Sequence, residues 1–355
     1  MAPSERPAGS FPDARQIFLG ALLFLAVFYT LYFARPVVLP LTIAILLNFL
    51  FSPVVRWLRQ RWRIPNGVSA ALVIVLLLGG MGITVYNLAA PAAAWVARAP
   101  ESYRRVEAQF RKLRKPVEQV SRTAERVEQM TGMTDTRTPT VQVRSGGLSA
   151  TLFGSTQSFL FGMVLVFTLL YFLLAQGDFF TEKLVRVLPR VRDRRLALTI
   201  AGETEQSVSA YLGTTTLVNA GLGILTGIAM WLLGLPNPEL WGLVGGLLNF
   251  VPYVGGLVAT VVFAMAGMAT FDTLGRALLP AITYLVLTNV ESFLTPVILG
   301  RRLTLNPVVI FLAVVFWGWL WGIPGALIAV PLVATLKIFC DHLPALSGLG
   351  EFLGK

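Results

Sequence analysis

Long apolar runs separated by short charged segments are the feature that most constrains the fold of this 355-residue chain. A helix needs about 20 consecutive apolar residues to cross the hydrocarbon core of a membrane. Eight segments approach or exceed that length. Only 13% of the residues are charged, whereas soluble domains carry about a quarter. The sequence therefore predicts an all-α integral membrane protein with about eight hydrophobic segments.

Six of these segments have the length of one full span, and two are longer. The six are Ile17–Ala34, Pro36–Val55, Asn66–Ala90, Thr151–Gln176, Tyr211–Leu235 and Ala277–Leu299. The other two, Leu240–Phe271 and Leu303–Leu336, contain no charged residue. As straight helices they would measure about 48–51 Å, against a hydrocarbon core of about 30 Å. Two full spans would need about 40 residues plus a turn. Each long run therefore predicts a re-entrant or broken helical hairpin.

Helix-breaking residues lie at the centre of both long runs. Backbone that leaves the helix at membrane depth is tolerated where it is buried in protein or lines a watery cavity. Paired interrupted segments indicate a transport site, although a simple kink that improves helix packing is the alternative. The candidate residues of a substrate pathway are Asn249, Pro252, Tyr253, Gly255 and Gly256 in the first run, and Gly322, Pro324 and Gly325 in the second.

Glu291 is the only charged residue between Arg276 and Arg301. An ionisable group within a membrane span carries a large desolvation penalty and by default indicates function. A carboxylate there can bind a cation or exchange a proton, so Glu291 is the candidate site for a coupling ion. The alternative is a structural partner for a nearby arginine. Polar residues share its helix and extend the candidate pathway: Tyr284, Thr288, Asn289 and Thr295.

Residues 91–150 differ from the rest because they are polar and charged. Apolar residues between Tyr103 and Val127 recur at alternating steps of three and four, a heptad pattern typical of paired helices. We expect Pro116 to kink or divide this helix. One interpretation is an extracytoplasmic helical domain that packs on itself or on neighbouring subunits, and the other is an amphipathic helix on the membrane surface. Residues 131–150 resemble a flexible linker.

The predicted organisation follows from these segments. It comprises a tail at 1–15, transmembrane segments at 16–90, the polar domain and linker at 91–150, a transmembrane core at 151–340 with re-entrant segments 240–271 and 303–336, and a tail at 341–355. Basic residues favour the cytoplasmic side of a membrane. With a cytoplasmic N-terminus, the basic cluster 56–63 and the basic amphipathic loop 178–206 lie inside. The pair Arg301 and Arg302 also lies inside if 240–271 is re-entrant.

Several classes of function are excluded because the sequence lacks their signatures. The net charge of +11 is explained by basic residues in cytoplasmic loops. Nucleic-acid binding would need a basic patch interleaved with aromatic residues, and the sequence has no such patch. Cys340 and His342 are the only residues of their types, so we expect no metal site and no other resident cofactor. The chain has no GxxxxGK[ST], HExxH or GxSxG motif, so we expect neither ATP-driven transport nor an enzyme.

Four stretches of the sequence carry a resemblance to a known family. They are "LLYFLLAQGDFFTEKLVRVLP" (169–189), "GLLNFVPYVGG" (246–256), "VESFLTPVILGRRLTLNP" (290–307) and "GIPGALIAVPLVATLKI" (322–338). Together they resemble the bacterial autoinducer-2 exporter family of transporters. Glu291 matches the family acid, whereas Gly256 and "LTNVES" depart from the family pattern. The resemblance implies a multi-pass protein of the bacterial cytoplasmic membrane that forms homo-oligomers, with a pentamer as one candidate.

The leading functional hypothesis is a secondary transporter that exports a small polar molecule of autoinducer-2 type. An H⁺ or Na⁺ gradient would drive it, with Glu291 as the coupling site. A sodium/proton antiporter is the first alternative. The second belongs to another class, a membrane scaffold protein that acts through residues 91–150.

Overall fold

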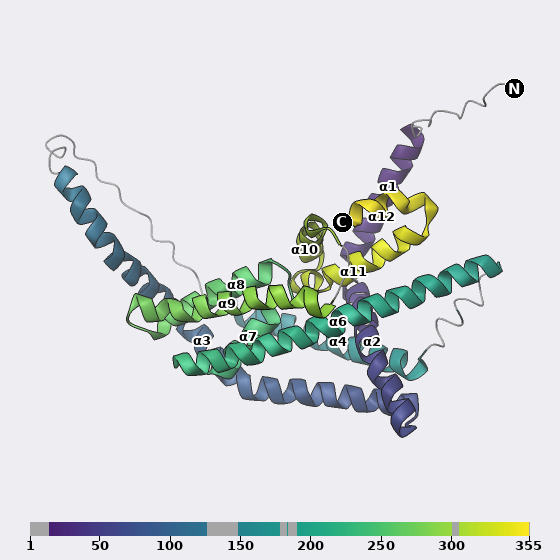
Figure 1. Cartoon of the computed structure of the whole chain (residues 1–355), viewed down its shortest axis with the longest axis horizontal. Helices are drawn as coiled ribbons and strands as arrows, with labels where there is room; N and C mark the ends of the chain where they lie inside the picture. Colours follow the sequence, from purple (N-terminus) through teal and green to yellow (C-terminus); the bar gives the residue numbers. More distant parts are fainter. Residues whose placement is uncertain (1–13, 126–147, 178–182, 184–189, 300–304, 355) are drawn as a thin grey trace.

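The computed structural model describes residues 14–125, 148–177, 183, 190–299 and 305–354 (Figure 1). These ranges are almost entirely α-helical and contain no strand, only the isolated bridge between Leu305 and Gly354. The predicted all-α class is therefore confirmed. The helices are α1 (Ala14–Phe33), α2 (Arg35–Trp62), α3 (Asn66–Glu125), α4 (Leu148–Gln176), α6 (Val191–Leu233), α7 (Pro238–Leu248), α8 (Val254–Thr270), α9 (Leu274–Leu299), α10 (Pro307–Trp321), α11 (Ile323–His342), the short 3₁₀ helix η1 (Pro344–Leu346) and α12 (Ser347–Leu353).

Five helices among the described residues are long and apolar enough to cross a membrane. They lie at Arg35–Trp62, Asn66–Ala97, Phe159–Gln176, Asp193–Leu233 and Ile323–His342. Large apolar side chains are exposed along most of the helices. Such a surface is stable against lipid and unstable against water. The chain is thus an all-α membrane protein, while the number of crossings stays a prediction.

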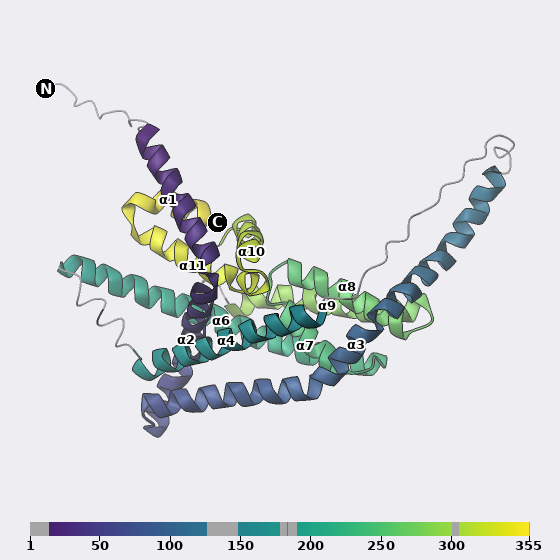
Figure 2. The same ribbon diagram turned by 180° about the vertical axis from the view of Figure 1, so that it is seen from behind.

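The first half of the chain builds a bundle of α2, α3 and α4. Its core contains Val55 from α2, Val73 from α3 and Leu170 from α4. The helix α3 has 60 residues, a length of about 90 Å. Figures 1 and 2 show it bending along its course and extending beyond the other helices. It is continuous through Pro116, so that proline does not divide it. The side chains of the predicted heptad pattern lie outside the described part of the chain.

The helices α6, α7, α8 and α9 surround a second core. Met230, Trp241, Phe263 and Tyr284 each contribute to it from a different helix. The helix α6 begins at Val191, so the second half of the predicted loop 178–206 is helical instead. It ends at Gly234, which has a φ of 77° and donates its backbone N–H to carbonyls of the last turn. This turn lets α7 fold back along α6.

Both long apolar runs are broken helices. The first consists of α7 and α8, with 11 and 17 residues, and the break covers residues 249–253. The second consists of α10 and α11, with 15 and 20 residues, which meet at Gly322. The arms α10 and α11 pack against each other through Val309, Ala313, Ala329 and Val333 and neighbouring side chains. The predicted interruptions are confirmed, and re-entrance into a membrane stays a prediction.

Candidate functional site

The break between α7 and α8 is a tight turn. The backbone N–H of Val254 donates to the Pro252 carbonyl at 2.7 Å, which closes a γ-turn around Tyr253. Tyr253 has a φ of 64° and a ψ of −52°, a strained conformation for a residue with a side chain. Strained backbone clusters at functional sites, where the surrounding structure holds it in place.

Three polar side chains from three helices meet at the start of this break. Asn249, the residue that ends α7, donates from Nδ2 to Asn219 Oδ1 of α6 at 2.8 Å. The same nitrogen donates to Glu291 Oε2 of α9 at 3.4 Å. Asn219 is only 2% exposed, whereas Asn249 and Glu291 are half-buried. We call Asn219, Asn249 and Glu291 the amide–carboxylate cluster. It joins a charge to a helix end through neutral hydrogen-bonding groups.

A second polar layer lies two turns along the same helices. Tyr284, seven residues before Glu291 on α9, donates its buried hydroxyl to the Gly245 carbonyl of α7 at 3.0 Å. Its ring stacks on Phe263 with 4.6 Å between the ring centres. Thr226, seven residues after Asn219 on α6, packs beside Gly245, and its buried hydroxyl has no hydrogen-bond partner among the described residues. A spacing of seven residues returns to the same helix face. Polar stripes of α6 and α9 therefore face each other across α7.

Glycines bring the amides of α6 and α7 within reach of each other. A Cβ added to Gly242 would lie 2.6 Å from the Gly223 carbonyl oxygen, and one added to Gly246 would lie 2.8 Å from the Asn219 carbonyl oxygen. The two backbones are thus in direct contact, as in small-residue helix pairs of membranes. This contact sets the distance over which the short Asn219 and Asn249 side chains can bond.

The structure brings only some of the predicted pathway residues to the cluster. Thr288 donates its hydroxyl to carbonyls of its own helix, including that of Tyr284 at 3.1 Å. Asn289 is exposed and donates to the Leu285 carbonyl at 2.7 Å. Thr295 belongs to α9, but its side chain lies outside the described residues.

At the break itself, the predicted residues have different surroundings. Pro252 is half-buried, and the side chain of Tyr253 is 58% exposed. Gly255 is buried against the Leu248 carbonyl, which leaves no room for a side chain and indicates a packing role. Gly256 borders the cluster, because a Cβ there would lie 3.8 Å from Asn249 Oδ1.

The second break has other partners. Gly322, with a φ of 72°, separates α10 from α11. Arg35, at the start of α2, donates from Nη2 to the Trp321 carbonyl at 3.0 Å. The Trp321 indole in turn donates to the Leu31 carbonyl of α1 at 3.2 Å. A cation at a helix C-terminus satisfies free carbonyls and opposes the helix dipole. Gly322 therefore belongs to a junction with α1 and α2, whereas the cluster joins α6, α7 and α9. Pro324 is half-buried, and Gly325 packs against the Trp317 carbonyl of α10.

The cluster has the composition of a site for a proton, a small cation or a polar solute. It offers one carboxylate and two amides. Within the described part of the chain, no three Asp, Glu, His or Cys side chains gather as metal ligands would.

Comparison with known proteins shows which family the chain belongs to. The family model for AI-2E family transporters matches residues 21–345, which include both breaks and all three cluster residues.

The chain belongs to the AI-2E transporter family. It is 27% identical over 315 residues to YrrI of Bacillus subtilis (strain 168), and the match covers 87% of each chain. It is 25% identical over 315 residues to the AI-2 transport protein TqsA of Escherichia coli (strain K12), again 87% of each chain. A protein of Borreliella burgdorferi shares 30% identity over 198 residues, which are 54% of this chain and 53% of its own length. The resemblance predicted from the sequence is confirmed, and the protein is a membrane transporter of this family.

Sequence reasoning missed two contributors to the site of this AI-2E family member. Asn219 was not among the predicted site residues, because an isolated amide in a span is more often an interhelical contact, yet it accepts the shortest hydrogen bond of the cluster. Thr226 was not singled out. The available signal was the pairing of small residues, since Gly223 and Gly227 on α6 have the same spacing as Gly242 and Gly246 on α7. Matched glycine spacings in two consecutive apolar helices indicate that the helices are in close contact, and polar residues beside such a contact are candidates for a site.

Proposed function

We propose that this AI-2E family protein is a secondary transporter in which the amide–carboxylate cluster couples an ion to a small polar solute. The observation that carries the proposal is the hydrogen-bonded chain from Asn219 through Asn249 to Glu291, located where α7 breaks. Broken helices whose ends present polar groups are the usual form of solute and ion sites in secondary transporters.

The chemistry of the cluster supports coupling. An ionised Glu291 accepts the hydrogen bond from Asn249. Protonation, or capture of Na⁺ by the carboxylate, would weaken that bond because the negative charge is lost or shared. Asn249 would then be released from one of its two partners at the end of α7. A change of ion occupancy would in this way alter the helix end that faces the solute.

The name of a relative supports the choice of solute in this proposal. TqsA is named an AI-2 transport protein, so autoinducer-2 is the first substrate to test. The sequence contains no nucleotide-binding GxxxxGK[ST] loop, and we infer that an H⁺ or Na⁺ gradient supplies the energy. Export rather than import, a bacterial cytoplasmic membrane with the N-terminus inside, and a homo-oligomer belong to the same proposal.

The test is flux in proteoliposomes containing the full chain. Wild type and Glu291→Gln would be compared for autoinducer-2 accumulation and internal pH under an imposed pH gradient, with and without Na⁺. We expect gradient-driven flux to be lost in Glu291→Gln. Glu239→Gln is the matched control, because Glu239 is exposed at the start of α7 and should leave flux unchanged. Equal flux in wild type and Glu291→Gln would refute coupling at this acid.

A second pair of variants tests the amides. Asn249→Ala removes the residue that links the cluster, whereas Asn87→Ala removes an exposed amide that donates to its own helix at the Ile83 carbonyl. We expect a large loss of flux from the first and little from the second. Sodium-dependent pH changes without autoinducer-2 transport would instead identify a sodium/proton antiporter. Retained flux in Asn249→Ala would show that the cluster is structural.

A further inference from the structure

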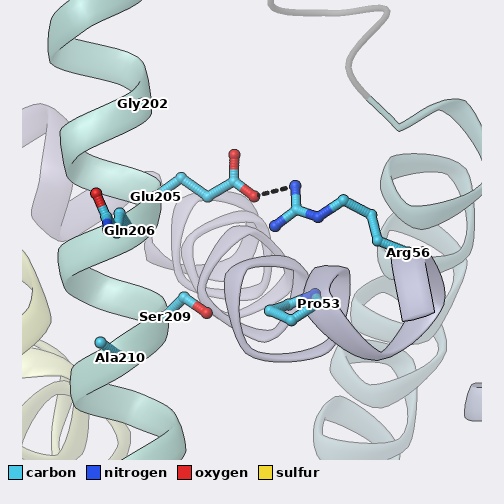
Figure 3. Close-up of a pocket in the computed structure, with 7 residues that line it drawn as sticks. All are labelled: Pro53, Arg56, Gly202, Glu205, Gln206, Ser209 and Ala210. Atoms are coloured by element: carbon cyan, nitrogen blue, oxygen red, sulfur yellow. Dashed lines mark hydrogen bonds and ion pairs between the residues drawn. The ribbon is translucent and has the colours of Figure 1, made fainter.

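A polar cleft separates α2 from α6, away from the amide–carboxylate cluster (Figure 3). Its volume is about 370 Å³, within the range of small-molecule sites. Its floor and walls combine small residues with hydrogen-bonding groups. The lining residues are Pro53, Arg56, Gly202, Glu205, Gln206, Ser209 and Ala210.

An ion pair bridges the cleft. Arg56 Nη1 of α2 lies 2.6 Å from Glu205 Oε1 of α6, as the dashed line in Figure 3 marks. Ser52, one turn before Arg56, donates its hydroxyl to the same oxygen at 3.2 Å. The side chains of Arg56 and Glu205 are 46% and 28% exposed. A half-exposed ion pair contributes little free energy, so its two side chains can separate and pair again.

The cleft and the cluster lie on one face of α6. Ser209, Thr216 and Asn219 follow Glu205 at intervals of 4, 11 and 14 residues, which places them within about 40° of Glu205 around the helix axis. Asn219 is therefore about 21 Å farther along the helix. Glu205, Ser209 and Thr216 are half-buried and Asn219 is buried. Leu212 lies on the same face between Ser209 and Thr216, so the polar groups that lead from the accessible cleft to the buried site are interrupted by one apolar side chain.

We propose that this cleft is the entrance vestibule of the transporter and that the Arg56–Glu205 ion pair is its gate. This inference rests on the proposed transport function. A solute would bind in the cleft, separate the pair, and move along the same face of α6 towards Asn219. The cleft carries one positive and one negative side chain together with an amide and a hydroxyl. It therefore suits a neutral or zwitterionic polar solute rather than an ion of one sign.

The position of the cleft also fits an entrance. The basic cluster 56–63 ends α2, and Arg194 and Arg195 lie in the first turn of α6 or just after it. The ion pair joins the basic cluster of α2 to a point on α6 about 15 Å from Arg195. Positive charge of this kind marks the cytoplasmic side, from which an exporter loads its solute.

Cysteine labelling tests whether the cleft is an aqueous entrance. Ser209→Cys would be made in the full chain with Cys340→Ala, and membrane vesicles would be treated with a charged, membrane-impermeant methanethiosulfonate reagent. Leu217→Cys is the control on the same helix, because Leu217 is 76% exposed on an apolar surface. Thiolates form readily only in polar surroundings, so we expect Cys at 209 to react at least about tenfold faster. Reaction should be fast in inside-out vesicles and slow in right-side-out vesicles.

Charge exchange tests the gate. Arg56→Gln and Glu205→Gln should each raise the labelling rate of Cys at 209 by about two- to fivefold, the contribution of a half-exposed ion pair. The exchanged pair Arg56→Glu with Glu205→Arg should restore the original rate. Glu203→Gln, which neutralises an exposed acid that contacts His342 instead, should change nothing.

The outcomes separate this inference from the proposed coupling site. Glu291→Gln should abolish gradient-driven flux and leave labelling at position 209 unchanged. Equal, slow labelling at 209 and 217 would overturn the vestibule even if Glu291 proves to be the coupling site. Labelling at 209 that is fast but insensitive to Arg56→Gln, Glu205→Gln and the exchanged pair would overturn the gate. The labelling of Ser209→Cys tests the vestibule with the ion pair intact, so that test stays valid even if a variant of Arg56 or Glu205 fails to fold.

Discussion

The direct backbone contact between α6 and α7 predicts that Gly242→Ala will weaken folding and transport together. The new Cβ would lie 2.6 Å from the Gly223 carbonyl oxygen and 3.1 Å from Gly227 Cα. Ordinary contact begins near 3.4 Å, so the helices must separate by about 0.8 Å. The hydrogen bond from Asn249 to Asn219, now 2.8 Å long, would then stretch to about 3.6 Å, beyond the range of a real hydrogen bond.

Three contributions decide the magnitude. Overpacking a tight contact costs about 1–3 kcal/mol, and a lost hydrogen bond costs about 0.5–1.5 kcal/mol. Alanine regains up to about 1 kcal/mol because it favours the helix more than glycine does. Together they predict that the free energy of unfolding falls by about 2 kcal/mol.

The single cysteine supplies the assay. Cys340 is fully buried, so a thiol-reactive dye reports unfolding of the purified protein during heating. With an unfolding entropy of about 2.1 cal/mol/K for each of the 355 residues, a loss of about 2 kcal/mol lowers the midpoint by roughly 3 °C. Gly221→Ala is the matched control, because nothing lies within 4 Å of a Cβ at that position of α6, and its midpoint should stay the same or rise. If Gly242→Ala unfolded at the same temperature as Gly221→Ala and kept full transport, the close contact could not have the role assigned to it.

Three further changes have expected outcomes in the same thermal assay. Arg35→Ala removes the guanidinium from the Trp321 carbonyl and should cost about 1.5–3 kcal/mol, the contribution of a charged hydrogen bond; no change in midpoint would contradict the junction. Tyr284→Phe keeps the ring on Phe263 but loses the hydrogen bond to the Gly245 carbonyl; because that carbonyl still accepts the backbone N–H of Asn249, the loss should cost only about 0.5–1.5 kcal/mol. Tyr253→Gly should raise the midpoint, because glycine relieves about 1–2 kcal/mol of strain at a positive φ; a lower midpoint would show that the turn is not strained.

The fold was largely predictable because the controlling signals are local. Apolar length predicted the helices, and Pro252 and the "GIPG" stretch predicted the two interruptions where α7 and α10 end. The lengths and ends of helices that no such signal marks were less predictable. The helix α6 begins at Val191 rather than Tyr211, because charged residues extend a helix as readily as apolar ones.

The candidate site was predictable only in part. Glu291 was visible in the sequence because a lone charge in an apolar run carries a large desolvation penalty and therefore stands out as a candidate. Asn219 was not, because an isolated amide in a span is usually an interhelical contact, and only the fold shows that it meets Asn249. The Arg56–Glu205 pair joins residues 149 positions apart, and no local pattern connects such residues.

The short length of α7 has an electrical consequence. Its 11 residues extend about 16 Å, roughly half of a 30 Å hydrocarbon core. If the turn at Gly234 lies at one membrane surface, Glu291 lies near half depth. A charge that crosses the whole membrane potential exchanges about 2.3 kcal/mol per 100 mV, so an ion that reaches Glu291 from either side exchanges about half of that. Loading and unloading would then each be electrogenic, and voltage alone would bias which side fills the site, even when concentrations are equal.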